Sequence, residues 1–229
     1  MKFILMLLLQ LLLWWVPLLG TGTAAEAGRP AAVAPGAILA NEKPIAEIQQ
    51  IRQMTREQAA LGRAVHLTGV CIYAACTEMV VHDGKVGIWV STITADKRGI
   101  LKKDVDYYSF RPGMILEITG VTDPGCYAPQ ILPITIRSHG ETVLPSAVPI
   151  SAERLLAGSE DGQRVKLEGV VQELQYLEDR VMGSIVVDGI NCWFALHGDA
   201  KSNLSAVVDA KVRVTGVFAP DFNYRSEAV

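Results

Sequence analysis

Four cysteines and four histidines are the side chains of this sequence best suited to metal binding or nucleophilic chemistry. A zinc site usually takes such ligands at short, regular spacings, as in a C-x2-C pair. Here each cysteine stands apart from the others and the histidines are scattered, so we expect no metal site and no cofactor. The residues concerned are Cys71, Cys76, Cys126, Cys192, His66, His82, His139 and His197.

The hydroxyl and carboxylate residues also lack a catalytic pattern. The sequence contains no G-x-S-x-G, no H-E-x-x-H and no P-loop motif. Acidic residues between the predicted strands are expected to be surface carboxylates. We therefore expect no enzymatic activity, because activity has to be argued from a site. These acidic residues are Asp104, Asp106, Asp123, Glu160, Asp161, Glu178 and Asp179.

The beginning of the chain predicts export. Lys2 precedes the apolar run 3–19, and the small residues 21–25 follow it. This pattern is typical of a signal peptide cleaved after Ala24 or Ala25. The alternative is an uncleaved membrane anchor, because the run approaches the ~20 residues that span a bilayer. We expect a periplasmic or secreted protein with a signal peptide at 1–25.

In an exported protein the cysteines can form disulfides. Cys76 and Cys126 lie in turn-like surroundings and predict a possible disulfide, whereas Cys71 and Cys192 fall within apolar strands. Spacing alone does not fix the pairing, and the alternative is that the cysteines are small core residues.

The net charge argues against a polyanionic partner. The chain has 21 basic and 24 acidic residues, a net charge of -3 that becomes -4 once Lys2 is removed. Binding to nucleic acid depends largely on Lys and Arg that displace counterions. We therefore do not expect nucleic acid to be a partner.

Alternating apolar and polar residues predict a β protein. After a flexible lead at 26–44, apolar residues at helical spacing occupy 45–54, and Thr55 with Gln58 forms a capping-box pattern for a helix at 56–61. Strands are predicted from Arg63 onward, with Asp83-Gly84 as a hairpin turn. The later strands are 78–82, 86–92, 114–121 and 131–138.

The pattern then repeats at an offset of 100 residues. Residues 164–171 match 64–71, and 212–217 match 116–121. We therefore predict two tandem copies of one domain, 45–143 and 151–229, joined by a Pro-marked linker at 144–150. The strand order fits an OB-like five-stranded barrel, in which Gly69 and Gly169 let the long first strand bend. An SH3-like or sandwich fold is the alternative.

An ordered set of motifs resembles the extracytoplasmic sensor region of certain large bacterial sensor histidine kinases. The set comprises 62–70, Pro112-Gly113, 127–131, Gly140, Leu144-Pro145, Ser151, Leu155, Gly158 and 161–165. The resemblance implies two OB-like domains between a signal peptide and a membrane helix with a kinase core. The sequence carries no such core, so kinase activity is not implied.

The second copy lacks a candidate for its closing strand. Only 218–229 follow Val217, so we expect a truncated receptor, which lacks a C-terminal extension, or a partner that supplies the strand. An open barrel would leave unpaired backbone edges.

Binding is the remaining class of function, and aromatic residues are its candidates. OB barrels commonly bind through strands two and three. The aromatic candidates are Trp89, Tyr107, Tyr108, Phe110, Trp193 and Phe194. Core packing is the alternative for the two tryptophans. We expect a non-catalytic sensing module for an unknown small ligand or protein, with an exported oligonucleotide- or oligosaccharide-binding protein as the alternative.

Overall fold

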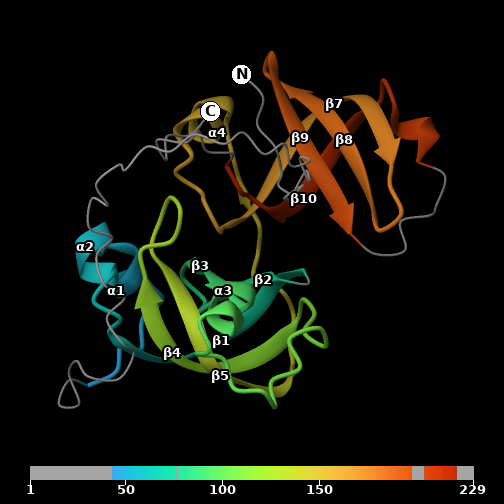
Figure 1. Cartoon of the computed structure of the whole chain (residues 1–229). Coiled ribbons are helices and arrows are strands. Elements are labelled where there is room, and N and C mark those ends of the chain that lie inside the picture. The colour runs from blue at the N-terminus through green and yellow to red at the C-terminus, as the bar shows by residue number, and fades with distance from the viewer. Residues whose placement is uncertain (1–42, 76, 198–203, 221–229) are drawn as a thin grey trace, which may run out of the picture.

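The computed structural model describes residues 43–75, 77–197 and 204–220, and within these ranges the protein is mostly β. Its strands form two sheets, one built from β1 to β5 and the other from β6 to β10, and short helices precede and connect these strands (Figure 1). None of the described helices has the length and apolarity needed to cross a bilayer. The apolar run 3–19 lies outside the described residues, so the signal peptide stays a prediction.

The first sheet is a closed barrel with the strand order β1-β2-β3-β5-β4. All neighbouring strands are antiparallel except β3 and β5, which pair in parallel at Val90 and Ile131. Its interior is filled by fully buried aliphatic side chains such as Ile88, Leu116 and Ile118. The strands are β1 (Ala64–Ala75), β2 (Glu78–His82), β3 (Gly87–Ser91), β4 (Met114–Asp123) and β5 (Gln130–Glu141).

Two short helices precede this barrel, as the apolar spacing predicts. They are α1 (Ile48–Arg52) and α2 (Arg56–Ala59), and the capping box between Thr55 and Gln58 is present. A third helix, α3 (Thr92–Lys97), was not predicted. Its sequence Thr-Ile-Thr-Ala-Asp-Lys is short and rich in β-branched residues, which disfavour helices. The local sequence therefore does not predict this helix.

The second sheet has the order β10-β7-β8-β9. The short strand β6 pairs in parallel with the beginning of β7. The helix α4 (Ala152–Ala157) precedes it, begins at a Ser151 cap and ends at Gly158 in the left-handed conformation. The elements are β6 (Val148–Pro149), β7 (Arg164–Tyr176), β8 (Arg180–Val187), β9 (Ile190–His197), the 3-10 helix η1 (Ser205–Val207) and β10 (Lys211–Val217).

The repeat is confirmed by equivalent pairing in the two sheets. Val65 pairs with Gly120 in the first, and Val165 pairs with Gly216 in the second. A side chain at Gly69 would lie 2.8 Å from the His82 carbonyl oxygen, and one at Gly169 would collide with the Val186 carbonyl. Both glycines therefore permit a close approach of the next strand, whereas the sequence had predicted that they let the first strand bend. The structure thus contains two OB-like units, of which only the first is closed by described strands.

Candidate functional site

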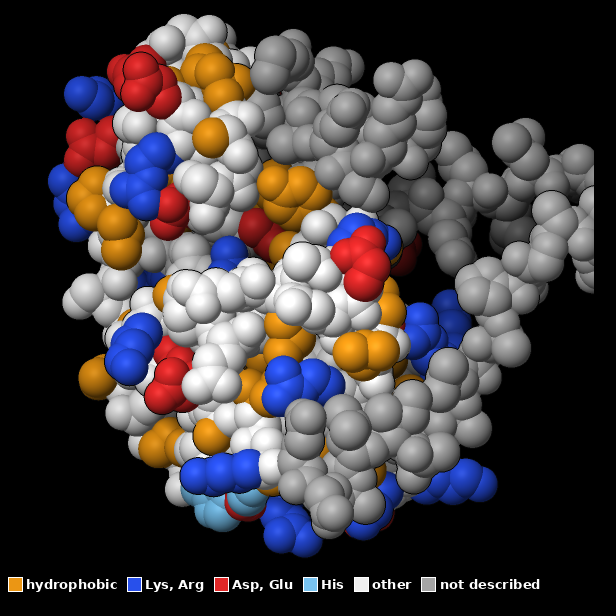
Figure 2. Space-filling model, turned by 90° about the vertical axis from the view of Figure 1, so that its left-hand side faces the viewer, with side chains coloured by type: hydrophobic (Ala, Val, Ile, Leu, Met, Phe, Trp, Pro, Cys, Tyr) orange, Lys and Arg blue, Asp and Glu red, His pale blue; other side chains and the backbone are white. Residues whose placement is uncertain are grey.

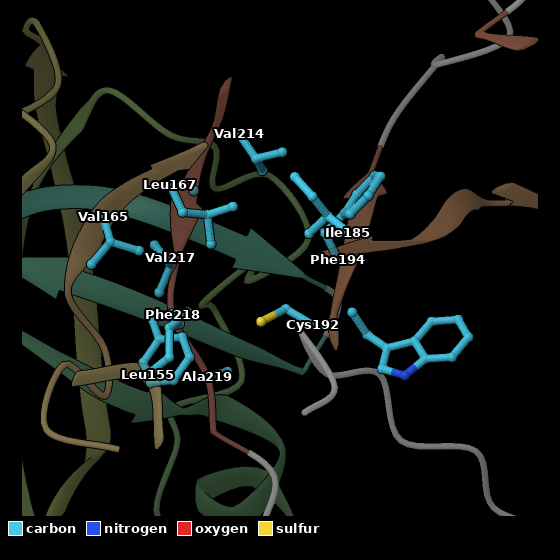
Figure 3. A pocket seen from close by; sticks show the side chains of 12 residues that line it. Leu155, Val165, Leu167, Ile185, Cys192, Phe194, Val214, Val217, Phe218 and Ala219 are labelled. Atoms are coloured by element: carbon cyan, nitrogen blue, oxygen red, sulfur yellow. The ribbon is translucent and has the colours of Figure 1, made fainter. Parts of the chain in front are cut away.

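An apolar cleft lies inside the second barrel, between β7 and the edges of β9 and β10. In Figure 3, Val165 and Leu167 of β7 face Cys192 and Phe194 of β9 across this space. Burial raises the pKa of the Cys192 thiol above its usual range. The remaining lining residues are Leu155, Ile185, Trp193, Val214, Gly216, Val217, Phe218 and Ala219. We call this space the cleft.

The first barrel shows what fills the equivalent space there. A side chain at Gly120 would lie 3.1 Å from Pro133 Cα and would collide with the carbonyl of Leu132, because β5 crosses this glycine. At the equivalent Gly216, no atom of the described residues lies within 4 Å. The second copy therefore keeps a glycine that is suited to a crossing strand.

Burial along the two equivalent strands differs in the same way. Leu116 and Ile118 of β4 are fully buried. Their counterparts on β10, Val212 and Val214, are only half-buried. Val214 lines the cleft, so this apolar face of β10 is less covered than the matching face of β4.

The two barrels meet at a buried polar contact. The indole Nε1 of Trp89 donates a hydrogen bond of 2.7 Å to Asp161 Oδ1. Arg52 Nη1 donates to the carbonyls of Gly87 (3.0 Å) and Asp161 (2.9 Å). The amide group of Gln163 accepts from Gly87 N at 3.0 Å and donates to Gly87 O at 3.2 Å. We call these five residues the joint.

Apolar and aromatic contacts surround the joint. Val217 at the end of β10 packs with Ile72 and Val80 of the first barrel. The ring of Tyr73 stands edge-on to Trp89, with centroids 5.9 Å apart, and edge-on to His197 of β9, with centroids 5.8 Å apart. Both β10 and β9 therefore touch the first barrel.

The joint is also bonded to the end of the strand that lines the cleft. Phe218 N donates to the Gln163 carbonyl at 3.0 Å, and Gly162 N donates to the Phe218 carbonyl at 2.9 Å. Val217 and Phe218 line the cleft. One continuous set of contacts therefore runs from the cleft through Gly162 and Gln163 to Gly87 and Trp89.

The expectation that Asp161 is a surface carboxylate was wrong. The residue is 5% exposed, because the loop that carries it packs against the first barrel. Burial raises its pKa, although the Trp89 hydrogen bond and the Arg52 charge act in the opposite direction. The pKa of nearby Glu78 is raised by burial and by Asp161. Asp123 is buried too, where it accepts a hydrogen bond of 2.7 Å from Arg98.

Replacing Asp161 with asparagine is expected to stabilise the protein at pH 7. Asparagine keeps an oxygen that can accept the Trp89 hydrogen bond and removes the buried charge. Because the folded-state pKa of Asp161 is raised above its usual 3.8, its charge disfavours folding above that pH. The advantage of Asp161→Asn should shrink as the pH falls toward 3.8.

Urea unfolding of both proteins at several pH values measures this difference. A variant less stable than the native protein at pH 7 would contradict the prediction. It would mean that the attraction between Arg52 and the carboxylate outweighs the cost of burial.

The predicted aromatic residues do not form one site. Trp89 belongs to the joint, while Trp193 and Phe194 line the cleft. Tyr107 and Tyr108 stack at 4.5 Å on the first barrel, where Tyr108 is 68% exposed. Phe110 packs against the core of that barrel. Their role in ligand binding stays a prediction, but only Trp193 and Phe194 share a cleft.

The predicted disulfide remains open. Cys126 is exposed, whereas Cys76 lies outside the described residues. Cys71 and Cys192 are buried, as expected for strand residues. Among the residues that the structure describes, no cluster of three His, Cys, Asp or Glu could hold a metal ion.

Charged side chains of both signs share the surface. Figure 2 shows Lys and Arg interspersed with Asp and Glu and with small hydrophobic groups on one face. On the outside of the first barrel, Glu117 pairs with His66 at 2.9 Å and His139 at 3.0 Å. These two hydrogen bonds lower the pKa of Glu117.

Sequence reasoning missed Arg52, which belongs to no motif, and the contacts of Gln163. The sequence feature that could have indicated the joint is the segment 161–165. It is part of the family resemblance, but no contact was predicted for it. The signal for the cleft was Gly216 in the repeated Thr-Gly-Val.

Comparisons with known proteins show only distant similarity. No family model matches the chain, and no curated protein matches it. A chain of the S. pombe Stn1-Ten1 complex is 17% identical over 44% of this chain and 81% of its own, with a TM-score of 0.30. The p204 HINb domain is 12% identical over 69% of this chain and 87% of its own, with a TM-score of 0.33. Asparaginyl-tRNA synthetase from Pyrococcus horikoshii is 13% identical over 48% of this chain and 27% of its own, with a TM-score of 0.31.

Proposed function

We propose that this chain is an exported, non-catalytic binding module that forms the sensor part of a signalling receptor. In this proposal the cleft of the second barrel receives the ligand, and the joint relays its presence to the first barrel. The observation that carries the proposal is the hydrogen bonding of Phe218, which lines the cleft, to Gly162 and Gln163 beside the joint. The motif resemblance to bacterial sensor regions supports the same class of function.

The first barrel offers less room for a ligand on its β2 and β3 strands. OB barrels commonly bind there. In this protein Gly87 and Trp89 of β3 are bonded to the second barrel, and Val80 of β2 packs against Val217. This contact favours the cleft over the groove that an oligonucleotide- or oligosaccharide-binding barrel would use.

Two tryptophans make the proposal testable without a known ligand. The indole of Trp89 reports on the joint. Trp193 is among the residues that line the cleft and stands between Cys192 and Phe194 on β9, so its indole reports on that strand. We expect Val214→Phe, which places a larger side chain in the cleft, to shift both indole N–H signals in a proton–nitrogen NMR spectrum. Thr215→Phe is the control, because Thr215 lies on the exposed face of the same strand.

If Val214→Phe shifts the Trp193 signal but leaves the Trp89 signal unchanged, the proposed transmission from the cleft to the joint is contradicted. The cleft would then have changed without any effect at the joint.

A further inference from the structure

Two strands of the second sheet have an unpaired edge. Among the described strands, β10 pairs only with β7 and β9 pairs only with β8, so they form the two ends of the sheet. Both contribute to the wall of the cleft, including Phe194 from β9 and Val214 from β10 (Figure 3). An unpaired edge presents a row of backbone N–H and C=O groups that can pair with another strand. The cleft therefore offers backbone hydrogen-bonding groups as well as apolar side chains.

The first barrel shows what kind of occupant such a space takes. There β5 lies between β3 and β4, antiparallel to β4 and parallel to β3. The equivalents of β3 and β4 are β9 and β10, and no described strand lies between them. At Gly120 of β4 an added side chain would collide with the Leu132 carbonyl, because the backbone of β5 crosses there. The repeat therefore indicates an extended polypeptide segment, antiparallel to β10, rather than a small molecule.

The side chains around the cleft define the chemistry of such a segment. None of the residues that line the cleft is charged, and most are aliphatic or aromatic. In the equivalent strand β5, Ile131 and Ile136 lie in the core, whereas Arg137 is exposed. Side chains of a strand point alternately to its two faces. The segment should therefore carry apolar side chains on the face turned to the cleft and polar ones on the face turned to water.

We propose that the cleft binds an extended segment of another polypeptide chain, which adds a fifth strand between β9 and β10 and runs antiparallel to β10. This names the partner of the cleft and so rests on the proposed function. Pairing along the whole of β10 takes seven residues. In the complex the backbone of the segment crosses Gly216 as β5 crosses Gly120, whereas in the free chain no described atom lies within 4 Å of Gly216.

A peptide with the sequence of β5, Gln130–Glu141, is the probe, because it already fits the equivalent space in the first barrel. Added to the full chain, it should shift the backbone amide signals of β9 and β10 in a proton–nitrogen NMR spectrum. Its nuclear Overhauser contacts should place it antiparallel to β10. A peptide that carries Ile131→Asp and Ile136→Asp should not bind, since both positions face a core.

Two variants of the full chain show whether the peptide crosses β10 at the predicted place. Gly216→Val should leave the free chain folded, because its side chain meets no described atom, yet it would collide with an added strand. It should weaken peptide binding by about ten-fold or more. Thr215→Val is the matched control, because Thr215 lies on the exposed face of the same strand, and it should bind like the native chain.

Three results would each overturn this inference. The first is no shift of the β9 and β10 signals with the native peptide at about 1 mM, the weakest affinity that a specific site would show. The second is equal binding by the native chain and Gly216→Val. The third is the same shifts on concentrating the chain without peptide, which would assign the cleft to a second copy.

The same spectra separate this inference from the proposed function. If the peptide does not bind but Val214→Phe still shifts the Trp89 indole signal, this inference fails and the proposed function stands. If the peptide binds at β9 and β10 without shifting the Trp89 signal, the partner is supported and the transmission to the joint is rejected.

Discussion

Replacing Gly120 with valine is expected to destabilise the first barrel by about 3 kcal/mol or more, at the upper end of what overpacking a well-packed core costs. The new side chain would collide with the Leu132 carbonyl and press on Pro133, both part of β5. Since β5 pairs with both β3 and β4, displacing it would open the barrel. Urea unfolding of the purified variant measures the loss.

Gly216→Val is the matched control for this prediction. Its position is equivalent, its backbone is outside the left-handed region, and no described atom lies within 4 Å. We expect its free energy of unfolding to lie within about 1 kcal/mol of the native value, as for substitutions that meet no core atoms. Equal losses at the two positions would show that the second barrel is as closed as the first.

Replacing Gly87 with alanine is expected to separate the two barrels. The added methyl group would collide with the Gly162 carbonyl, because the strand β3 and the loop at 161–163 approach each other directly. The Gly87 backbone adopts an ordinary conformation, so the β2–β3 hairpin itself tolerates alanine. The variant should lose about 1–3 kcal/mol and unfold in two separate steps.

Calorimetry distinguishes the steps, and Gly216→Ala serves as the control because it adds the same methyl group in open space. A Gly87→Ala protein that unfolds in one step at the native temperature would show that this close approach does not hold the barrels together.

Local patterns predicted the strands well because each is encoded by its own residues. The strand 78–82 was predicted with the same bounds as β2, and the capping box at Thr55 was confirmed by its hydrogen bonds. The repeat of Thr-Gly-Val located β4 and β10 and, through them, the two glycines that now differ in their surroundings. Predictions of this kind depend only on residues that are close together in the sequence.

The joint could not be predicted in the same way. Trp89 and Asp161 are 72 residues apart, and Arg52 and Asp161 are 109 apart. Nothing in the local sequence of Asp161 distinguishes a buried carboxylate from the surface carboxylate that we expected. The contact arises only when the loop before β7 packs on β3. The helix α3 was missed for a related reason, since its β-branched residues give no helical signal and its buried Ala95 packs with Leu101 and Leu132.

The central claim is that the joint makes the two barrels respond as one unit. Urea unfolding followed at four residues tests this claim most directly. The indole N–H signals of Trp89 and Trp193 report on the joint and on β9 of the second barrel. Backbone amides of Leu116 and Ile118 report on the core of the first barrel. Coupled barrels should lose all of these native signals at the same urea concentration. Loss of the Trp193 signal at a lower concentration, while the Trp89 and first-barrel signals persist unchanged, would contradict the account.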